Sequence, residues 1–248
     1  MKIMPAFACM FIGFTITGFS QIPTGADVIK EIDKNLVLDK AISSTTMIIH
    51  GRNGTRSIKS KNWIEGKDKA FVEYTDPARE KGKKMLKLGE QLWNYFPEPI
   101  DRIITISGHL LRQSVMGSDL SYEDITENRK LMDMYNAKVL GSEKINDRNC
   151  YVVELTGKLE DITYYSRKLW VDKERWLPLK EERYAKSGKA LKRSEMLEVF
   201  SVENRWYPKR MIHHDLMQNG EGTEYIIESM VLHATISESQ FTKAALKK

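Results

Sequence analysis

Thirteen short runs in which apolar and polar residues alternate follow one another along this chain, and they constrain its fold more than any other feature. An alternation with a period of two is typical of half-buried β-strands. Turn-forming residues separate the runs, as in "NDRN" at Asn146, "KSGK" at Lys186 and "QNGEG" at Gln218. The predicted strands are residues 45–51, 57–65, 69–74, 83–88, 91–96, 102–107, 137–143, 150–156, 163–171, 177–184, 191–199, 207–214 and 224–233. A sheet with so many strands cannot stay flat, so we expect one continuous antiparallel sheet that curls into a barrel or half-barrel.

Two segments outside these strands have helical patterns. In "PTGADVIKEIDKNLVLDKA", Thr24 is a candidate N-cap with Asp27 three residues on, and the side that would face the core carries Val28, Ile29, Ile32 and Leu36. We expect this helix to pack on the domain core, with a lid over a cavity as the alternative. Residues 108–136 form the one long interruption of the strands, and they predict one or two short helices.

The N-terminus has the pattern of a secretory signal. Lys2 is followed by an apolar run over residues 3–19 and by the small residue Ser20, which predicts cleavage near Ser20–Gln21. A transmembrane anchor is the alternative. We expect residues 1–20 to be a signal peptide, no lipidation at Cys9, and residues 21–248 to form a single domain. Cys150 is then the only cysteine left, so no internal disulfide can form.

Charge and hydropathy place the rest of the chain in the soluble globular class, with 29% charged and 41% hydrophobic residues. The formal net charge of +5 is mild, whereas nucleic-acid-binding proteins usually show clustered basic faces with interleaved aromatic residues. An exported protein also rarely meets nucleic acid, so no nucleic-acid partner is expected. The densest basic loop is the candidate docking surface for an anionic membrane or an acidic partner, and it contains Arg79, Lys81, Lys83 and Lys84.

Large apolar side chains fall on both faces of one predicted hairpin, "GKKMLKLGEQLWNYFPEPI" at residues 82–100. A curved sheet that lines a hollow, or that is covered by helices, needs such residues on both faces. A filled sandwich core is the alternative. By size and alternation, the candidates for the lipid-binding lining of a hollow are Met47, Ile49, Trp63, Phe71, Leu86, Leu88, Trp93, Tyr95, Ile104 and Met116.

One acidic cluster offers paired carboxylates for acid–base chemistry: Asp119, Glu123 and Asp124, beside Tyr122. The same acids suit the first turn of a helix capped by Ser118 or Asp119. We expect capping.

Other chemical motifs are sparse. His213 and His214 are adjacent on a predicted strand, so they point to opposite faces and do not easily share one metal. The sequence has no metalloprotease, serine-hydrolase or phosphate-loop motif. No metal, cofactor or catalytic residue is therefore expected. The mixed basic and aromatic stretches "RWLPLKEERY" and "NRWYPKRM" are expected on the solvent faces of strands, with contacts to phosphate head groups or a protein partner as the alternative.

Three stretches carry a resemblance to a known family: "GKKMLKLGEQLWNYFPEPIDRIITISGHLLRQSVMGSDLSYEDI", "LWVDKERWLPLKEERYAKSGKALK" and "RWYPKRMIHHDLMQNGEGTEYII". The chain resembles the outer-membrane lipoprotein-sorting proteins, the LolA-like group of periplasmic carriers, over residues 22–237. "MGSDLSYED" at 116–124 is the most specific element. The resemblance implies a mainly β fold, an incomplete, half-open antiparallel β-barrel whose helices cover a hydrophobic cavity that receives acyl chains.

These observations together predict a non-enzymatic periplasmic carrier that binds acyl chains of lipoproteins, or of related envelope lipids, for outer-membrane sorting. An inner-membrane transporter and an outer-membrane acceptor are the partners that such a carrier would meet. One alternative is an envelope enzyme that acts on glycan or lipid through Asp119, Glu123 or Asp124. Another is a structural partner of an envelope complex, which would have a filled interior.

Overall fold

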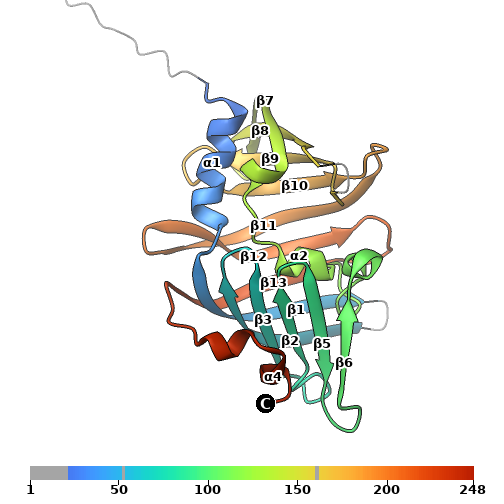
Figure 1. Cartoon of the computed structure of the whole chain (residues 1–248). Helices are drawn as coiled ribbons and strands as arrows, with labels where there is room; N and C mark the ends of the chain where they lie inside the picture. The colour runs from blue at the N-terminus through green and yellow to red at the C-terminus, as the bar shows by residue number, and fades with distance from the viewer. Residues whose placement is uncertain (1–21, 52–53, 160–161) are drawn as a thin grey trace, which may run out of the picture.

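The computed structural model describes residues 22–51, 54–159 and 162–248 (Figure 1). The predicted signal peptide and Cys9 lie outside the described residues. The strands are β1 (Lys40–Gly51), β2 (Gly54–Glu65), β3 (Lys69–Asp76), β4 (Lys84–Leu88), β5 (Gln91–Phe96), β6 (Arg102–Ile106), β7 (Tyr135–Ile145), β8 (Arg148–Gly157), β9 (Ser166–Asp172), β10 (Pro178–Tyr184), β11 (Ala190–Val202), β12 (Arg205–Asp215) and β13 (Thr223–Leu232). The helices are α1 (Gly25–Leu36), η1 (Gly108–Arg112), α2 (Tyr122–Thr126), α3 (Leu131–Met134), η2 (Glu238–Phe241) and α4 (Lys243–Leu246).

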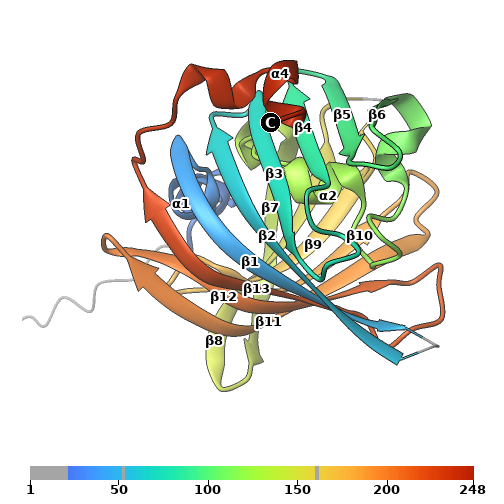
Figure 2. The same ribbon diagram turned by 90° about the horizontal axis from the view of Figure 1, so that it is seen from below.

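All these strands belong to one antiparallel sheet in the order β6-β5-β4-β3-β2-β1-β13-β12-β11-β10-β9-β8-β7. Strands that follow one another in the chain pair with each other, except β6 and β7. The first strand, β1, also pairs with the last one, β13, in the middle of the sheet. In the described part of the chain, β6 and β7 are the free edges and do not pair with each other. The sheet therefore curls without closing, and Figure 2 shows it wrapped around α1 and α2. The predicted half-open barrel with an N-terminal helix and short inserted helices is confirmed.

Helix α1 begins where the sequence predicts. The Thr24 side chain accepts from the Asp27 backbone N–H, and the Asp27 carboxylate accepts from the Thr24 backbone, which makes a capping box. The buried face of α1 joins a core cluster with β8, β9 and α3. Gly25 allows the helix to approach β7 closely, because a Cβ at this position would lie 2.2 Å from the Ala137 carbonyl oxygen. The expected packing of this helix on the core is confirmed.

The long interruption contains η1, α2 and α3, but α2 begins later than predicted. Its N-cap is Ser121, whose hydroxyl accepts from the Asp124 N–H at 3.1 Å while Asp124 Oδ2 accepts from the Ser121 N–H at 2.8 Å. Capping by Ser118 or Asp119 is therefore wrong. The Asp119 carboxylate instead accepts from the Asp215 N–H at 2.8 Å and from Thr223 Oγ1 at 2.6 Å, which ties the loop before α2 to β12 and β13.

Strands β3, β4 and β5 are buried on both faces, which explains the apolar hairpin at residues 82–100. Val72 and Met85 belong to the cluster under η1 and α2. Phe71 and Leu86, one residue away on each strand, point to the opposite face and pack against the C-terminal segment with η2 and α4. Two separate covers, one on each face of this part of the sheet, therefore account for its large side chains.

We expect Leu246→Ala to lower the free energy of unfolding by about 2–4 kcal/mol, because Leu246 is fully buried beneath the C-terminal segment and its loss leaves a cavity. Urea unfolding followed by circular dichroism measures the change. Leu197→Ala is the matched control, since Leu197 is 47% exposed, and its effect should stay within about 0.5 kcal/mol. Equal effects of the two substitutions would contradict the C-terminal segment as part of the core.

Candidate functional site

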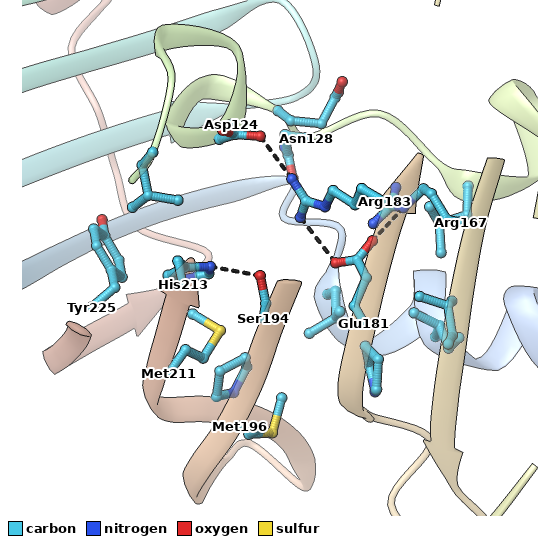
Figure 3. Close-up of a pocket in the computed structure, with 18 of the residues that line it drawn as sticks. Asp124, Asn128, Arg167, Glu181, Arg183, Ser194, Met196, Met211, His213 and Tyr225 are labelled. Atoms are coloured by element: carbon cyan, nitrogen blue, oxygen red, sulfur yellow. Dashed lines mark hydrogen bonds and ion pairs between the residues drawn. The ribbon is translucent and has the colours of Figure 1, made fainter. Parts of the chain in front are cut away.

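A cavity of about 330 Å³ lies inside the curl of the sheet, between α1, the segment from α2 to α3, and strands β9 to β13 (Figure 3). This volume is within the range of small-molecule sites in proteins. The apolar part of its wall includes Ile32, Leu36, Leu169, Met196, Met211 and Tyr225. The interior of the half-barrel is therefore not completely filled by its own side chains.

Strand register brings the inward side chains of β11 and β12 together. Met196 pairs with Met211, and two residues along the ladder Ser194 pairs with His213. Residues two apart on a strand share a face, so these four side chains form one strip along the cavity. Methionine is flexible and polarizable, and two of them give this strip a surface that can adapt to irregular apolar partners.

A buried chain of ion pairs that centres on Asp124 adjoins this strip, because Glu181 on β10 is the cross-strand partner of Ser194. Arg183 Nη1 donates to Asp124 Oδ1 at 2.7 Å, and Lys192 Nζ donates to Asp124 Oδ2 at 2.6 Å. Tyr164 Oη donates to the same carboxylate at 2.8 Å. Burial by itself raises the pKa of the Asp124 carboxyl, but Arg183 and Lys192 outweigh burial and hold this pKa well below its ordinary value. Asp124 is thus a buried carboxylate with no proton to give as a general acid.

The chain of ion pairs continues to Glu181 on β10. Arg183 Nη2 donates to Glu181 Oε2 at 2.9 Å, and Arg167 Nε donates to Glu181 Oε1. Burial opposes ionisation of Glu181, yet Arg167 and Arg183 lower its pKa to about 2. Five charged groups from α2, β9, β10 and β11 are therefore linked directly, as Figure 3 shows for four of them.

His213 is the polar group nearest the methionines in this strip. It is buried, and its Nδ1 lies 2.8 Å from Ser194 Oγ. Burial, together with the charge of Arg183, lowers the pKa of His213 to about 4, so the imidazole is uncharged at neutral pH. His214 is only half-buried, so the two adjacent histidines differ in their surroundings. The Ser194–His213 pair gives the cavity a neutral hydrogen-bonding group.

One side chain holds the cover of the cavity in place. Asn128, between α2 and α3, accepts from the Leu38 N–H at 3.0 Å, and its amide donates to the carbonyl oxygens of Leu38 and Gly66 at 2.8 and 2.7 Å. Asp33 of α1 accepts from the Leu131 N–H at 2.8 Å at the start of α3. These contacts join α1, β1 and the β2–β3 turn to the segment that crosses the cavity.

We expect Asn128→Ala to lower the free energy of unfolding by about 2–3 kcal/mol, because three backbone groups lose their partner at about 1 kcal/mol each. Hydrogen exchange in residues 126–134 should also become faster. The control is Asn149→Ala in the β7–β8 hairpin, where the asparagine is exposed. Unchanged exchange in residues 126–134 would show that Asn128 does not hold this segment.

The stability of the protein should depend on the charge of Glu181 at acidic pH. The pKa of Glu181 is lowered in the folded state to about 2. The ionised Glu181 carboxylate therefore adds to the free energy of unfolding above about pH 4.5, and this stabilisation is lost as the pH falls toward 2. We therefore expect the difference in unfolding free energy between wild type and Glu181→Gln to shrink from pH 6 to pH 3. The exposed Glu228→Gln serves as the control. A difference that stays constant over this range would contradict the ion-pair assignment.

A second hollow of about 480 Å³ adjoins the first one. It lies between the β4–β5 turn, α2 and the loop after β8, and Glu127 and Arg129 line both hollows. Arg129 Nε donates to Glu127 Oε1 at 2.9 Å, and both side chains are partly exposed. This ion pair thus lies between the cavity and a more polar, outer hollow.

The ten residues that the sequence predicts as cavity lining fall into three groups. Met47, Ile49 and Met116 lie in the cluster under η1 and α2. Ile104 on β6 is 38% exposed. The other six lie in the cluster under the C-terminal segment: Trp63, Phe71, Leu86, Leu88, Trp93 and Tyr95. Within the described ranges, the wall of the 330 Å³ cavity contains none of the ten, and lipid contact by these residues stays a prediction.

The predicted docking loop lies at the β3–β4 turn. The Arg79 side chain is 88% exposed and Lys81 is exposed. Lys83 pairs with Glu80 at 2.5 Å, and Lys84 lies 3.9 Å from Glu73. Arg79 Nε also lies 3.9 Å from Glu80 Oε1, so three of the four basic groups have an acidic partner, and docking by this loop stays a prediction.

Two charged residues of the cavity wall, Glu181 and Arg183, come from a stretch that the sequence analysis placed on the solvent side. The expectation that "RWLPLKEERY" faces solvent is wrong for Glu181 and Arg183, which are drawn into the cavity wall by Asp124 and Arg167. The alternation of Glu181 and Arg183 on one strand face was the available signal. It could not be separated from ordinary surface charge without the partner Asp124, 59 residues away.

No helix within residues 22–51, 54–159 and 162–248 is long and apolar enough to cross a membrane. In the same residues, no group of three or more His, Cys, Asp or Glu side chains could hold a metal ion.

Comparisons with known proteins agree with the fold. A protein-family model described as an uncharacterized protein matches residues 66–248. A LolA superfamily protein from Nitrosomonas europaea is 25% identical with a TM-score of 0.75, and the match covers 90% of this chain and 100% of that one. A DUF1329 family protein from Desulfovibrio piger is 24% identical with a TM-score of 0.82, and the match covers 90% of this chain and 98% of that one. A domain from Vibrio parahaemolyticus that is assigned to outer membrane lipoprotein sorting is 22% identical with a TM-score of 0.79. This match also covers 90% of this chain and 98% of that one. Among curated proteins, none matches this sequence.

Proposed function

We propose that this chain is a periplasmic carrier that holds lipid acyl chains in the cavity beneath α1. The chain belongs to the family whose model matches residues 66–248, and its fold is LolA-like. The cargo is the acyl part of lipoproteins or of related envelope lipids. The carrier is not an enzyme. The observation that carries the proposal is the unfilled interior of the half-barrel, with apolar side chains from α1, β9, β11 and β12 in its wall.

The energetics suit this task. Each methylene moved from water into an apolar site contributes about 0.8 kcal/mol. About ten methylenes therefore contribute about 8 kcal/mol before the cost of ordering the chain, which is sufficient for micromolar affinity or somewhat weaker. The carrier would thus hold one acyl chain in water and still release it to a tighter acceptor.

The segment from Glu127 to Arg129 is the proposed route of entry. This segment separates the cavity from the second hollow. Its Glu127–Arg129 ion pair is partly exposed, and exposed ion pairs contribute little to stability. Opening this segment would break the three hydrogen bonds of Asn128 and connect the apolar interior to the second hollow. An inner-membrane transporter would load the carrier and an outer-membrane acceptor would unload it, and the exposed Arg79 and Lys81 are proposed to face one of these partners or an anionic membrane.

Lipid extraction tests the proposal. The full chain is expressed with its predicted signal, purified from the periplasm without detergent, and extracted with organic solvent for mass spectrometry. We expect about one equivalent of an acylated lipid, or uptake of about one equivalent when stripped protein meets lipid vesicles. A periplasmic protein of similar size treated in parallel gives the background. Repeated absence of both co-purified lipid and uptake would remove the proposed function.

A further inference from the structure

The ion pairs in the cavity wall do not balance in charge. The linked chain runs Arg167–Glu181–Arg183–Asp124–Lys192, with three cations and two carboxylates. His213 adds no charge at neutral pH. The directly connected network therefore has one positive charge in excess, on side chains that are at most 17% exposed.

A buried excess charge is costly unless an opposite charge or several hydrogen bonds accompany it. The other carboxylates in the cavity wall do not join this network. The Asp33 carboxylate accepts from the backbone N–H groups of Leu131 and Met132. Glu127 is paired with Arg129, and Glu195 is paired with Arg193 at 3.3 Å. The excess cation is thus left to solvent or to a ligand in the cavity.

Arg183 also retains an unused donor. Two of its guanidinium nitrogens are occupied by Asp124 and Glu181, but its buried Nε has no hydrogen-bond partner among the described residues. Arg183 contributes to the cavity wall together with Ser194 and His213, which supply a neutral hydrogen-bonding group on the neighbouring strands β11 and β12. Figure 3 shows the Arg183 guanidinium and the Ser194–His213 pair among the residues that line the same cavity.

From this arrangement we infer that the cavity selects an amphiphile with one anionic group, which lies at Arg183 while the acyl chain lies along Met196 and Met211. The inference rests on the proposed carrier function and narrows its cargo. A carboxylate or a phosphodiester would supply the missing negative charge and would accept the free Arg183 N–H, because charge-assisted hydrogen bonds in a site of low dielectric are strong. A neutral acyl ester would satisfy the apolar wall but leave the excess cation uncompensated.

Competition with a fluorescent acyl probe tests the inference on the stripped wild-type protein. Three competitors share one palmitoyl chain: palmitate has a carboxylate, palmitoyl-lysophosphatidylglycerol has a phosphodiester, and monopalmitin is neutral. We expect at least one of the anionic compounds to bind about tenfold more tightly than monopalmitin. Whichever one does so identifies the source of the charge. Equal or tighter binding of monopalmitin would overturn the inference while the carrier function stands, and absence of binding by all three would remove both.

Variants then place the anionic group. Arg183→Gln should bring the affinities of the anionic and neutral compounds to within about threefold of each other. Lys180→Gln is the matched control, because Lys180 lies on the same strand but contacts Glu182 and the Trp170 ring away from the cavity. Full selectivity in a folded Arg183→Gln protein would contradict the placement. Should that variant fail to fold, the comparison of the three compounds on wild type still decides the inference.

Discussion

Replacing Met211 by tryptophan is expected to weaken acyl-chain binding by about tenfold or more while the protein stays folded. Met211 is half-buried and lies in the cavity wall opposite Met196. The indole ring would occupy the space of at least two methylenes of the ligand, and each excluded methylene costs about 0.8 kcal/mol, so two of them account for roughly tenfold. Displacement of a fluorescent acyl probe from stripped protein measures the affinity.

The control for this substitution is Leu197→Trp on the neighbouring strand. Leu197 is 47% exposed, so its replacement adds the same ring outside the cavity and should leave binding within about twofold. Circular dichroism and urea unfolding should show that Met211→Trp costs no more than about 1–3 kcal/mol, the usual range for a larger side chain in a packed interior. Normal binding by a folded Met211→Trp protein would place the ligand elsewhere.

We expect Asp124→Ala to have the largest effect on stability, a loss of about 3–5 kcal/mol. The Asp124 carboxylate accepts from the Ser121 N–H and hydroxyl, from Tyr164, from Arg183 and from Lys192. Its removal leaves the buried Lys192 without a carboxylate partner and leaves Arg183 paired with Glu181 alone. It also takes away the half of the α2 capping box that Asp124 supplies, and loss of one member of a buried ion pair is costly because the remaining charge stays buried. Urea unfolding at pH 7 measures the change.

Glu123→Ala is the matched control for Asp124→Ala. Glu123 lies one residue earlier in α2 and accepts one hydrogen bond, from Thr163 Oγ1 at 2.7 Å, so we expect a loss of about 1 kcal/mol. A loss below 1 kcal/mol for Asp124→Ala would contradict the role of the ion pairs. The two residues also differ as tests of the alternative that the acidic cluster is a catalytic site. A loss of activity in an Asp124 variant could come from the loss of stability alone, whereas Glu123→Gln tests catalysis with little disturbance of the fold.

The sequence predicted those features that depend on neighbouring residues. The alternation of polar and apolar residues indicated thirteen strands, and thirteen are present in the described chain. The Thr24–Asp27 capping box was visible because both of its partners lie within one turn. The sequence analysis placed the N-cap of α2 too early, because Ser118 and Ser121 are both followed by acidic residues. Which residue caps the helix depends on distant contacts: the Asp119 carboxylate accepts hydrogen bonds from β12 and β13.

The position of the cavity depended on contacts between distant residues. Alternation identified two apolar faces for β3 to β5, but it could not show that helices and the C-terminal segment fill both of them. The open space lies instead under α1, where β11 and β12 bring Met196 and Met211 together across the ladder. The sequence predicted that the charged residues of β10 face solvent. Their partners, Asp124 and Arg167, belong to other elements, so these ion pairs could not be recognised from the sequence of β10.

Photo-crosslinking with a palmitoyl lipid that carries a diazirine at mid-chain tests most directly where the acyl chain binds. After irradiation of the loaded protein and proteolysis, we predict labelled peptides from residues 191–197 and 205–215 and from α1, the elements that surround the cavity. Met211→Trp should remove this labelling, and Leu197→Trp should retain it. Labels confined to residues 84–96 beneath the C-terminal segment, or no specific label at all, would contradict the acyl-binding cavity beneath α1.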